Sequence, residues 1–261
     1  MAVDMWRLAD DLAAETADLR VLLAPLDEPG WRRATPAPGW TVLDQVTHLA
    51  HFDEATIRAA TKPDAFRADL ERAGTVDPDA IAASYRSRTG AEVLAWFDDT
   101  RARLIAVFGE VDPGLRLTWY GPAMSAASAL TARIMETWAH GQDVADALDV
   151  QRIPTDRLRH VAHLGIAAQP YSFAVNGRSA PTTPVRVELT APSGAVWTWG
   201  PDDAEDRVAG PAEDFCLVVT RRRHRDDTAL QISGPVAQEW MTIAQAYAGP
   251  PGPGREPNRT R

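Results

Sequence analysis

The chain has 261 residues, 45% hydrophobic and 24% charged, which are proportions of ordinary globular proteins, and this length suits one large or two modest domains. Its 27 lysines plus arginines against 36 aspartates plus glutamates give a formal net charge of −9, which disfavours binding to nucleic acid by charge neutralisation. The single cysteine, Cys216, excludes an intramolecular disulfide, and we find no secretion signal and no apolar run of about 18 residues, so we expect a cytoplasmic protein without a membrane span.

The first half of the chain carries the apolar periodicity of amphipathic helices. Apolar residues recur at steps of three and four from residue 3 onward, and a segment rich in proline and glycine at 29–39 interrupts them. Thr41, followed three residues later by Asp44, is a plausible start for the second helix. We therefore predict a four-helix bundle with long helices at residues 3–26, 41–61, 81–108 and 125–148.

The composition changes after a fifth predicted helix at 155–175. Beyond it, alternation with period two predicts a hairpin at 185–190 and 196–199, which is typical of β-strands with one buried face. Further strands and helices are expected at 207–209, 212–221, 229–233 and 235–247, which makes this part a small α+β module. The predicted organisation is a helix bundle at 1–178, an α+β domain at 179–249 and a disordered tail at 250–261.

Histidines carry most of the chemical signal. The sequence lacks dinucleotide-binding, Walker-type, paired Cys-x-x-Cys and Gly-x-Ser-x-Gly motifs. His48 and His51 are one turn apart on the second predicted helix, and Glu136 and His140 share a face of the fourth. Alanines surround these side chains on both helices, whereas a solvated face normally carries long charged residues, so we predict a pocket.

Two nitrogens and one oxygen from His48, Glu136 and His140 form the three-ligand pattern in which zinc keeps an open coordination position. That pattern is typical of catalytic sites. The competing interpretation is that Glu136 and His140 form an ordinary i, i+4 pair and that His48 is a hydrogen-bonded core histidine.

Two runs of residues resemble the signature helices of the DinB-like metal enzymes. They are PGWTVLDQVTHL at 38–49 and METWAHGQDVA at 135–145. The Glu-x-x-x-His form is similar to that of the mycothiol-dependent maleylpyruvate isomerases, and WYGP at 119–122 resembles an uncharacterised actinobacterial branch of metal-binding proteins in that superfamily. The resemblance implies an N-terminal DinB-like four-helix bundle followed by a small sterol-carrier-like α+β domain.

The resemblance also implies site residues and a cofactor. His48, Glu136 and His140 would hold a divalent metal, with zinc as the expected ion, and mycothiol or a similar low-molecular-weight thiol would be the cosubstrate. An arginine of the run 221–225, for which we take Arg222, would pair with a substrate carboxylate. The competing interpretation of that run is a solvated helix end.

Other candidate residues have open roles. His51 is a catalytic candidate that would replace His48, act as an acid or base, or lie beside the bundle. Trp119 and Tyr120 are cofactor-binding candidates because they lie on a loop before the ligand helix, although buried tryptophans are more often core residues. His160 and His163 have no partner motif and are predicted to be structural.

The leading functional hypothesis is a metal- and thiol-dependent isomerase or S-transferase that acts on a small electrophilic substrate, as a monomer or a homodimer. The first alternative is a metal-dependent hydrolase, in which the same ligands activate water without a thiol. The second is a non-catalytic module in which the bundle holds a structural metal and the second domain binds a lipid.

Overall fold

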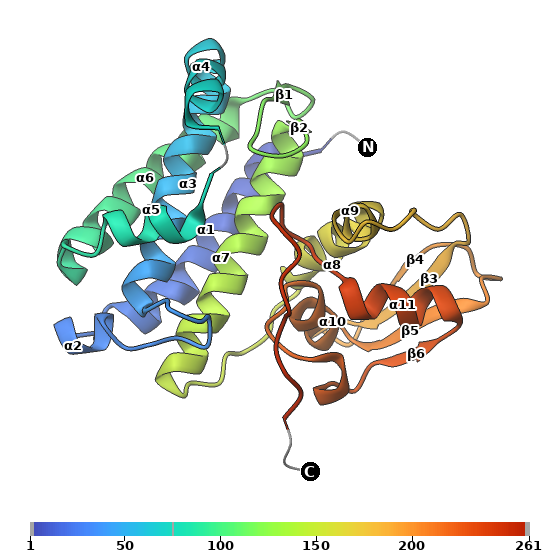
Figure 1. Cartoon of the computed structure of the whole chain (residues 1–261). Helices are drawn as coiled ribbons and strands as arrows, with labels where there is room; N and C mark the ends of the chain where they lie inside the picture. Colours follow the sequence, from blue (N-terminus) through green and yellow to red (C-terminus); the bar gives the residue numbers. More distant parts are fainter. Residues whose placement is uncertain (1–2, 75, 259–261) are drawn as a thin grey trace. The chain divides into compact units, whose positions relative to one another are not determined.

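The computed structural model describes residues 3–74 and 76–258, and its contacts divide the chain into two compact units, Met1–Arg152 and Ile153–Arg261. The first unit is helical apart from a two-stranded ribbon, and the second combines helices with a four-stranded sheet (Figure 1). The predicted fold class, a helix bundle followed by a small α+β domain, is confirmed. Within the described part of the chain, no helix has the length and apolar character needed to cross a membrane.

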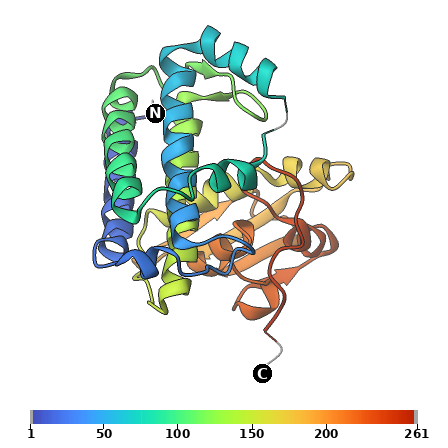
Figure 2. The ribbon, with the colours of Figure 1, turned by 60° about the vertical axis from the view of Figure 1, so that its left-hand side comes forward.

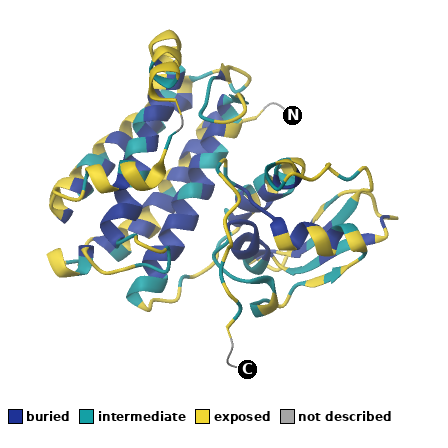
Figure 3. Ribbon diagram, viewed as in Figure 1, coloured by how far each residue is buried: buried dark blue, intermediate teal, exposed yellow. Residues whose placement is uncertain are grey.

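Four long helices form the bundle of the first unit. Each of α1 and α3 packs against both α6 and α7, which closes the bundle, and the long helices lie side by side in Figure 2. Buried residues lie on the inward faces of these helices and exposed residues on their outward faces, as the burial colours of Figure 3 show. The bundle helices are α1 (Met5–Leu23), α3 (Val42–Thr61), α6 (Gly90–Glu110) and α7 (Ala126–Leu148).

Local sequence signals start the two helices that carry the candidate ligands. Thr41 and Asp44 form a reciprocal capping box at the start of α3, as the sequence predicts. The Ser125 side chain accepts a hydrogen bond from the amide of Ser128 at the start of α7. Shorter elements connect the bundle helices: α2 (Glu28–Trp31), α4 (Pro63–Ala73), α5 (Pro78–Ser84), β1 (Arg116–Leu117) and β2 (Met124–Ser125).

The prediction of a single long helix at 81–108 is wrong. The chain instead forms α5 and α6, with a break after Tyr85. A second capping box, made by Thr89 and Glu92, begins α6 and satisfies its first amides. Gly90 lies against the indole of Trp31, where a Cβ would come within 2.2 Å of the ring, so the turn is held by tertiary packing.

A buried polar layer separates two apolar clusters in the bundle. One cluster contains Leu12 and Phe52 and the other contains Leu19 and Leu49. Asp53, next to Phe52 on α3, is fully buried and accepts hydrogen bonds from two arginines that are also buried. These arginines are Arg101 and Arg133, at 2.8 and 2.9 Å. Because buried charges are costly unless paired, this layer specifies how α3, α6 and α7 align.

The second unit is built on a sheet of order β4-β3-β5-β6. The predicted hairpin is confirmed as the antiparallel pair β3 and β4, whereas β3 and β5 are parallel. Val187 and Leu189 of β3 are fully buried, in agreement with the period-two pattern, and α10 and α11 pack against the sheet. The strands are β3 (Val185–Thr190), β4 (Val196–Trp199), β5 (Asp206–Pro211) and β6 (Gln231–Ser233), and the helices are α8 (Leu158–Ala167), α9 (Gln169–Val175), α10 (Ala212–Val219) and α11 (Pro235–Ile243).

The compact units divide after Arg152, whereas the sequence analysis places the domain boundary after residue 178. The helix predicted at 155–175 is two helices, α8 and α9, since the chain turns at Ala168 and a proline begins α9. Their partners explain their place in the second unit, because α8 packs on α10 and α9 packs on α11.

The C-terminal tail has no regular secondary structure in its described part, which ends at Asn258. It nevertheless makes hydrogen bonds: the Asn258 amide donates to the Asp227 carboxylate at 3.0 Å, and the carbonyl of Gly252 accepts from Arg221. The last part of the tail that the sequence predicts to be disordered, 259–261, lies outside the described residues.

Candidate metal centre

Three side chains from two bundle helices converge in the first unit. His48 lies on α3, and Glu136 and His140 lie one turn apart on α7. The Glu136 Oε2 atom is 3.1 Å from His140 Nε2 and 3.7 Å from His48 Nε2. One ligand atom from each residue lies within 4.8 Å of the other two, so the structure brings together the three residues that the sequence analysis selected.

Gln45 orients the ring of His140. Its amide nitrogen donates to Thr35 Oγ1 at 2.8 Å, which turns its Oε1 atom toward His140 Nδ1. The Oε1 atom accepts a hydrogen bond from that nitrogen, so the Nδ1 atom carries a proton and the Nε2 atom faces Glu136. A hydrogen bond to the far nitrogen of a histidine is the usual support for a metal ligand.

Aromatic rings enclose the cluster. The Trp40 ring stacks on His140 with centroids 6.0 Å apart and lies 5.4 Å from the His48 ring. Trp40 is itself held by a hydrogen bond of 2.6 Å from its indole nitrogen to Asp79. On the other side, the Phe52 ring lies 4.5 Å from His48. These rings lower the local polarity and limit the access of water to the ligand atoms.

Burial and neighbouring groups shift the pKa values of His48 and Glu136. Burial lowers the pKa of His48 to about 3, with a smaller contribution from His140, so the His48 imidazole is neutral at pH 7. Burial alone would raise the pKa of Glu136, but hydrogen bonds from His140 and His48 outweigh it and hold this pKa well below its usual range. The cluster therefore offers a carboxylate and neutral imidazole nitrogen, the forms in which these groups bind metals.

The donor set and its spacing fit a divalent metal such as zinc. Bonds of about 2.0 to 2.1 Å in a tetrahedral arrangement place ligand atoms about 3.3 to 3.4 Å apart. The separations of 3.1 and 3.7 Å around Glu136 bracket this value. His48 Nδ1 is buried without a hydrogen-bond partner among the described residues, so nothing in the described chain fixes that imidazole through its far nitrogen. Three protein ligands leave a coordination position for a substrate or a thiol.

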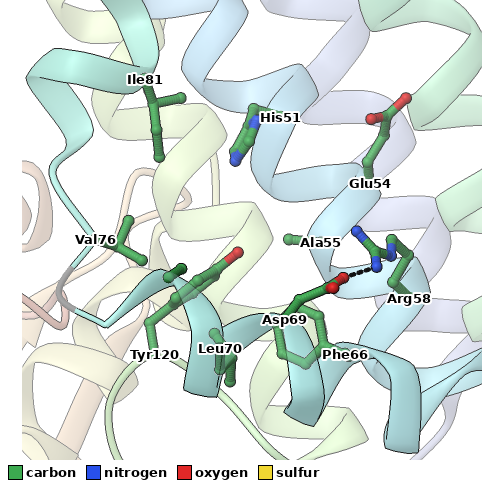
Figure 4. Close-up of a pocket in the computed structure, with 11 residues that line it drawn as sticks. His51, Glu54, Ala55, Arg58, Phe66, Asp69, Leu70, Val76, Ile81 and Tyr120 are labelled. Carbon is green, nitrogen blue, oxygen red and sulfur yellow. Dashed lines mark hydrogen bonds and ion pairs between the residues drawn. The ribbon is translucent and has the colours of Figure 1, made fainter.

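His51 lies outside the cluster of three. Its Nδ1 atom is 3.0 Å from the Tyr85 hydroxyl, and burial lowers its pKa. His51 instead lines a cavity with Tyr120, as Figure 4 shows. The neighbouring Trp119 packs on aromatic rings, with its centroid 6.1 Å from that of Phe66.

Arg222 belongs to the second unit and follows α10. Its Nη1 atom donates to the carbonyl of Thr220 at 2.7 Å. The helix predicted at 212–221 ends at Val219, and Arg221 adopts a positive φ of 60°, so the run of arginines begins in a turn. His160 and His163, which the sequence analysis predicts to be structural, lie on α8.

Sequence reasoning missed the role of Gln45. It lies in the first signature run, three residues before His48 and so about one turn away on α3. That spacing was the available signal, but it does not show which residue of α7 the amide meets. Trp40 contacts both histidine rings, and these contacts depend on the path of the loop before α3.

Comparisons with known proteins identify relatives of both parts of the chain. The family model of the mycothiol maleylpyruvate isomerase N-terminal domain matches residues 12–145 of the 261, and a model described as wyosine base formation matches residues 181–231. An uncharacterized protein of Mycobacterium tuberculosis, found in strains CDC 1551 and H37Rv, is 48% identical over 94% of this chain and 96% of its own length.

Two solved structures share the fold. The crystal structure of a mycothiol-dependent maleylpyruvate isomerase matches with a TM-score of 0.51 and 17% identity, covering 88% of this chain and 93% of that one. A histidine-to-alanine mutant of such an isomerase matches with a TM-score of 0.50 and 17% identity, covering 86% and 91%. The N-terminal model spans more than half of the residues, so the chain belongs to the mycothiol maleylpyruvate isomerase N-terminal domain family within the DinB-like superfamily, as its two helical motifs predict.

Proposed function

We propose that this protein is a metal-dependent enzyme that uses a low-molecular-weight thiol, such as mycothiol, to isomerise a small electrophilic substrate or to transfer the thiol onto it. The observation that carries the proposal is the cluster of His48, Glu136 and His140, whose ligand atoms lie within 4.8 Å of one another. The family contains thiol-dependent isomerases, and this supports the thiol as cosubstrate.

A divalent ion held by these three residues supplies a Lewis acid that stabilises a thiolate, which is the nucleophilic form of a thiol. Glu136 contributes the negative charge of the ligand set, and Gln45 keeps His140 in the tautomer that presents its Nε2 lone pair. Trp40 and Phe52 restrict water around the reacting atoms.

The thiol has to come from outside the chain. Cys216 is the only cysteine, and it is fully buried in α10. Burial raises the pKa of its thiol well above the usual range, so Cys216 is not a source of thiolate at neutral pH. This supports a mechanism in which a soluble thiol is the nucleophile.

Three further roles belong to the proposal. His51 is neutral at pH 7 and acts as a proton acceptor or donor for the substrate. Trp119 and Tyr120 bind the thiol cosubstrate or the substrate through their rings. Arg222 pairs with a substrate carboxylate through its guanidinium group.

Metal content per chain tests the centre directly. We would measure it by elemental mass spectrometry on protein purified without added metal or chelator, for wild type, His48→Ala and Glu136→Gln. We expect about one zinc per wild-type chain and its loss in both variants, with the helical circular dichroism unchanged. His163→Ala is the matched control, because His163 is an exposed histidine outside the cluster. A wild type that holds no zinc even after reconstitution would refute the proposal.

Activity assays then separate the chemical alternatives. Maleylpyruvate, the substrate in the relatives' name, is the first electrophile to test, with and without mycothiol. Turnover that requires the thiol supports the proposal, whereas turnover without it indicates a metal-dependent hydrolase. Tightly held zinc, co-purified lipid and no turnover would indicate a non-catalytic binding module. Arg222→Ala should raise KM for a carboxylate substrate without changing zinc content.

A further inference from the structure

A separate cavity lies in the first unit, beside the ligand helix α3. It has a volume of about 280 Å³, is partly open to solvent, and is lined by residues of α3, α4, the link between α4 and α5, α5 and the segment between β1 and β2 (Figure 4). This volume is close to the lower bound of about 300 Å³ for small-molecule sites. The cavity therefore has room for one small molecule.

The walls of the cavity are mainly apolar. Phe66, Leu70, Val76 and Ile81 contribute hydrocarbon surface, and the ring of Tyr120 lies across it. These residues come from four different segments, so the cavity is shaped by tertiary packing. Apolar and aromatic walls favour a ring or a branched hydrocarbon body, because burial of such a body removes apolar surface from water.

Hydrogen-bonding groups are available at the same cavity. The His51 ring extends from α3 toward the space between Ile81 and Tyr120 in Figure 4. Its Nδ1 atom is engaged with the Tyr85 hydroxyl at 3.0 Å, so its Nε2 atom is the one that a ligand meets. A neutral imidazole nitrogen suits a hydroxyl or an amide group on the ligand.

The charges on the lining disfavour an anion. Glu54 and Asp69 are carboxylates, and Arg58 is the only guanidinium group among the lining residues. Arg58 is already paired with Asp69, as the dashed line in Figure 4 shows. A carboxylate ligand would therefore find no uncommitted cation among the lining residues to bind it.

We infer that this cavity binds a small ring-bearing molecule that has no negative charge and carries one hydrogen-bonding group near His51 Nε2. His51 and Tyr120 also have roles in the proposed function, but the ligand class inferred here follows from the cavity lining, which includes none of the three candidate metal ligands. Phe52 connects the two sites: its ring lies 4.5 Å from that of His48 and 5.5 Å from that of Tyr120.

The test compares two probes of the same size and different charge. Binding of para-fluorobenzyl alcohol and para-fluorobenzoate to the full-length, metal-free protein would be measured by fluorine NMR. We expect the alcohol to bind with a millimolar or lower Kd and the benzoate to bind at least about tenfold more weakly. Absence of alcohol binding, or equal binding of the two probes, would overturn the inference. This comparison needs no variant.

A pair of variants on α4 locates the binding. Ala73 is exposed and lines the cavity, so Ala73→Trp should fill it and raise the Kd of the alcohol at least about tenfold. Ala68 is exposed on the same helix and does not line the cavity, so Ala68→Trp should leave the Kd within about twofold. If Ala73→Trp fails to fold, Ile81→Trp fills the cavity from α5. Equal Kd values for filled and control variants would show that the probe binds elsewhere.

Discussion

Replacement of Gln45 by methionine should weaken metal binding while leaving the fold intact. Gln45 is fully buried, and its Oε1 atom accepts the proton of His140 Nδ1. Methionine fills a similar volume but its thioether is only a weak acceptor. The substitution therefore removes the group that selects the His140 tautomer without opening a large cavity.

The expected loss of metal affinity follows from the tautomer that His140 adopts in the Gln45→Met variant. Without metal, the ring adopts the other tautomer and donates from Nε2 to Glu136, which lies at 3.1 Å. Metal binding through Nε2 then requires a proton on Nδ1 that is buried without a partner. An unsatisfied buried donor costs about 1 to 3 kcal/mol, which corresponds to an affinity lower by about 5- to 150-fold.

The assay is zinc affinity by competition with a chromophoric chelator at neutral pH. Gln45→Glu is the matched control, because it keeps an oxygen acceptor at the same place and should bind zinc at least as tightly as wild type. Urea unfolding of the metal-free proteins measures any separate loss of stability. A Kd for Gln45→Met within about twofold of the wild-type Kd would refute the reasoning.

Three further outcomes follow from the structure. Asp53→Asn should lower the free energy of unfolding by about 3 to 5 kcal/mol in urea, since it leaves two buried arginines without their carboxylate; a loss below about 1 kcal/mol would contradict this. In metal-free protein, the pKa of His48 is about 3 when folded against 6.5 when unfolded, so the unfolded state binds the extra proton and stability falls with decreasing pH below about 6.5. His48 contributes at most about 1.4 kcal/mol per pH unit to the slope between about pH 6 and 5, above the range where Glu136 contributes, and His48→Gln should remove that contribution; an unchanged slope would count against the pKa assignment. Gly90→Ala should lower the Tm despite the better helix propensity of alanine, because its Cβ would lie 2.2 Å from the Trp31 ring; an increase in Tm would disprove that clash.

Local sequence patterns were sufficient for most elements that position the site. The capping box of Thr41 and Asp44 marked the start of α3, and the apolar periodicity marked the extent of α7. Glu136 and His140 share a face of α7 by spacing alone. These features depend on interactions within a few residues, so the sequence carries them without the rest of the molecule.

The break between α5 and α6 and the boundary between the two compact units were harder to predict from the sequence. Residues 81–108 read as one helix because their apolar periodicity continues through the turn, but the packing of Gly90 on Trp31 and the capping box at Thr89 divide it. Helices α8 and α9 lie in the second compact unit because they pack on α10 and α11, which come later in the chain. Periodicity does not encode which partner a helix face meets.

The sequence by itself determined the helical bundle with its α+β companion, and it singled out two helices that offer metal ligands. Only the tertiary structure decided that His48, and not His51, joins Glu136, and that Gln45 fixes the ring of His140. It also decided the cavity that His51 lines. The physical reason is that a hydrogen bond or a ring contact between distant segments depends on helix rotation and loop path, which are set by the packing of the whole bundle.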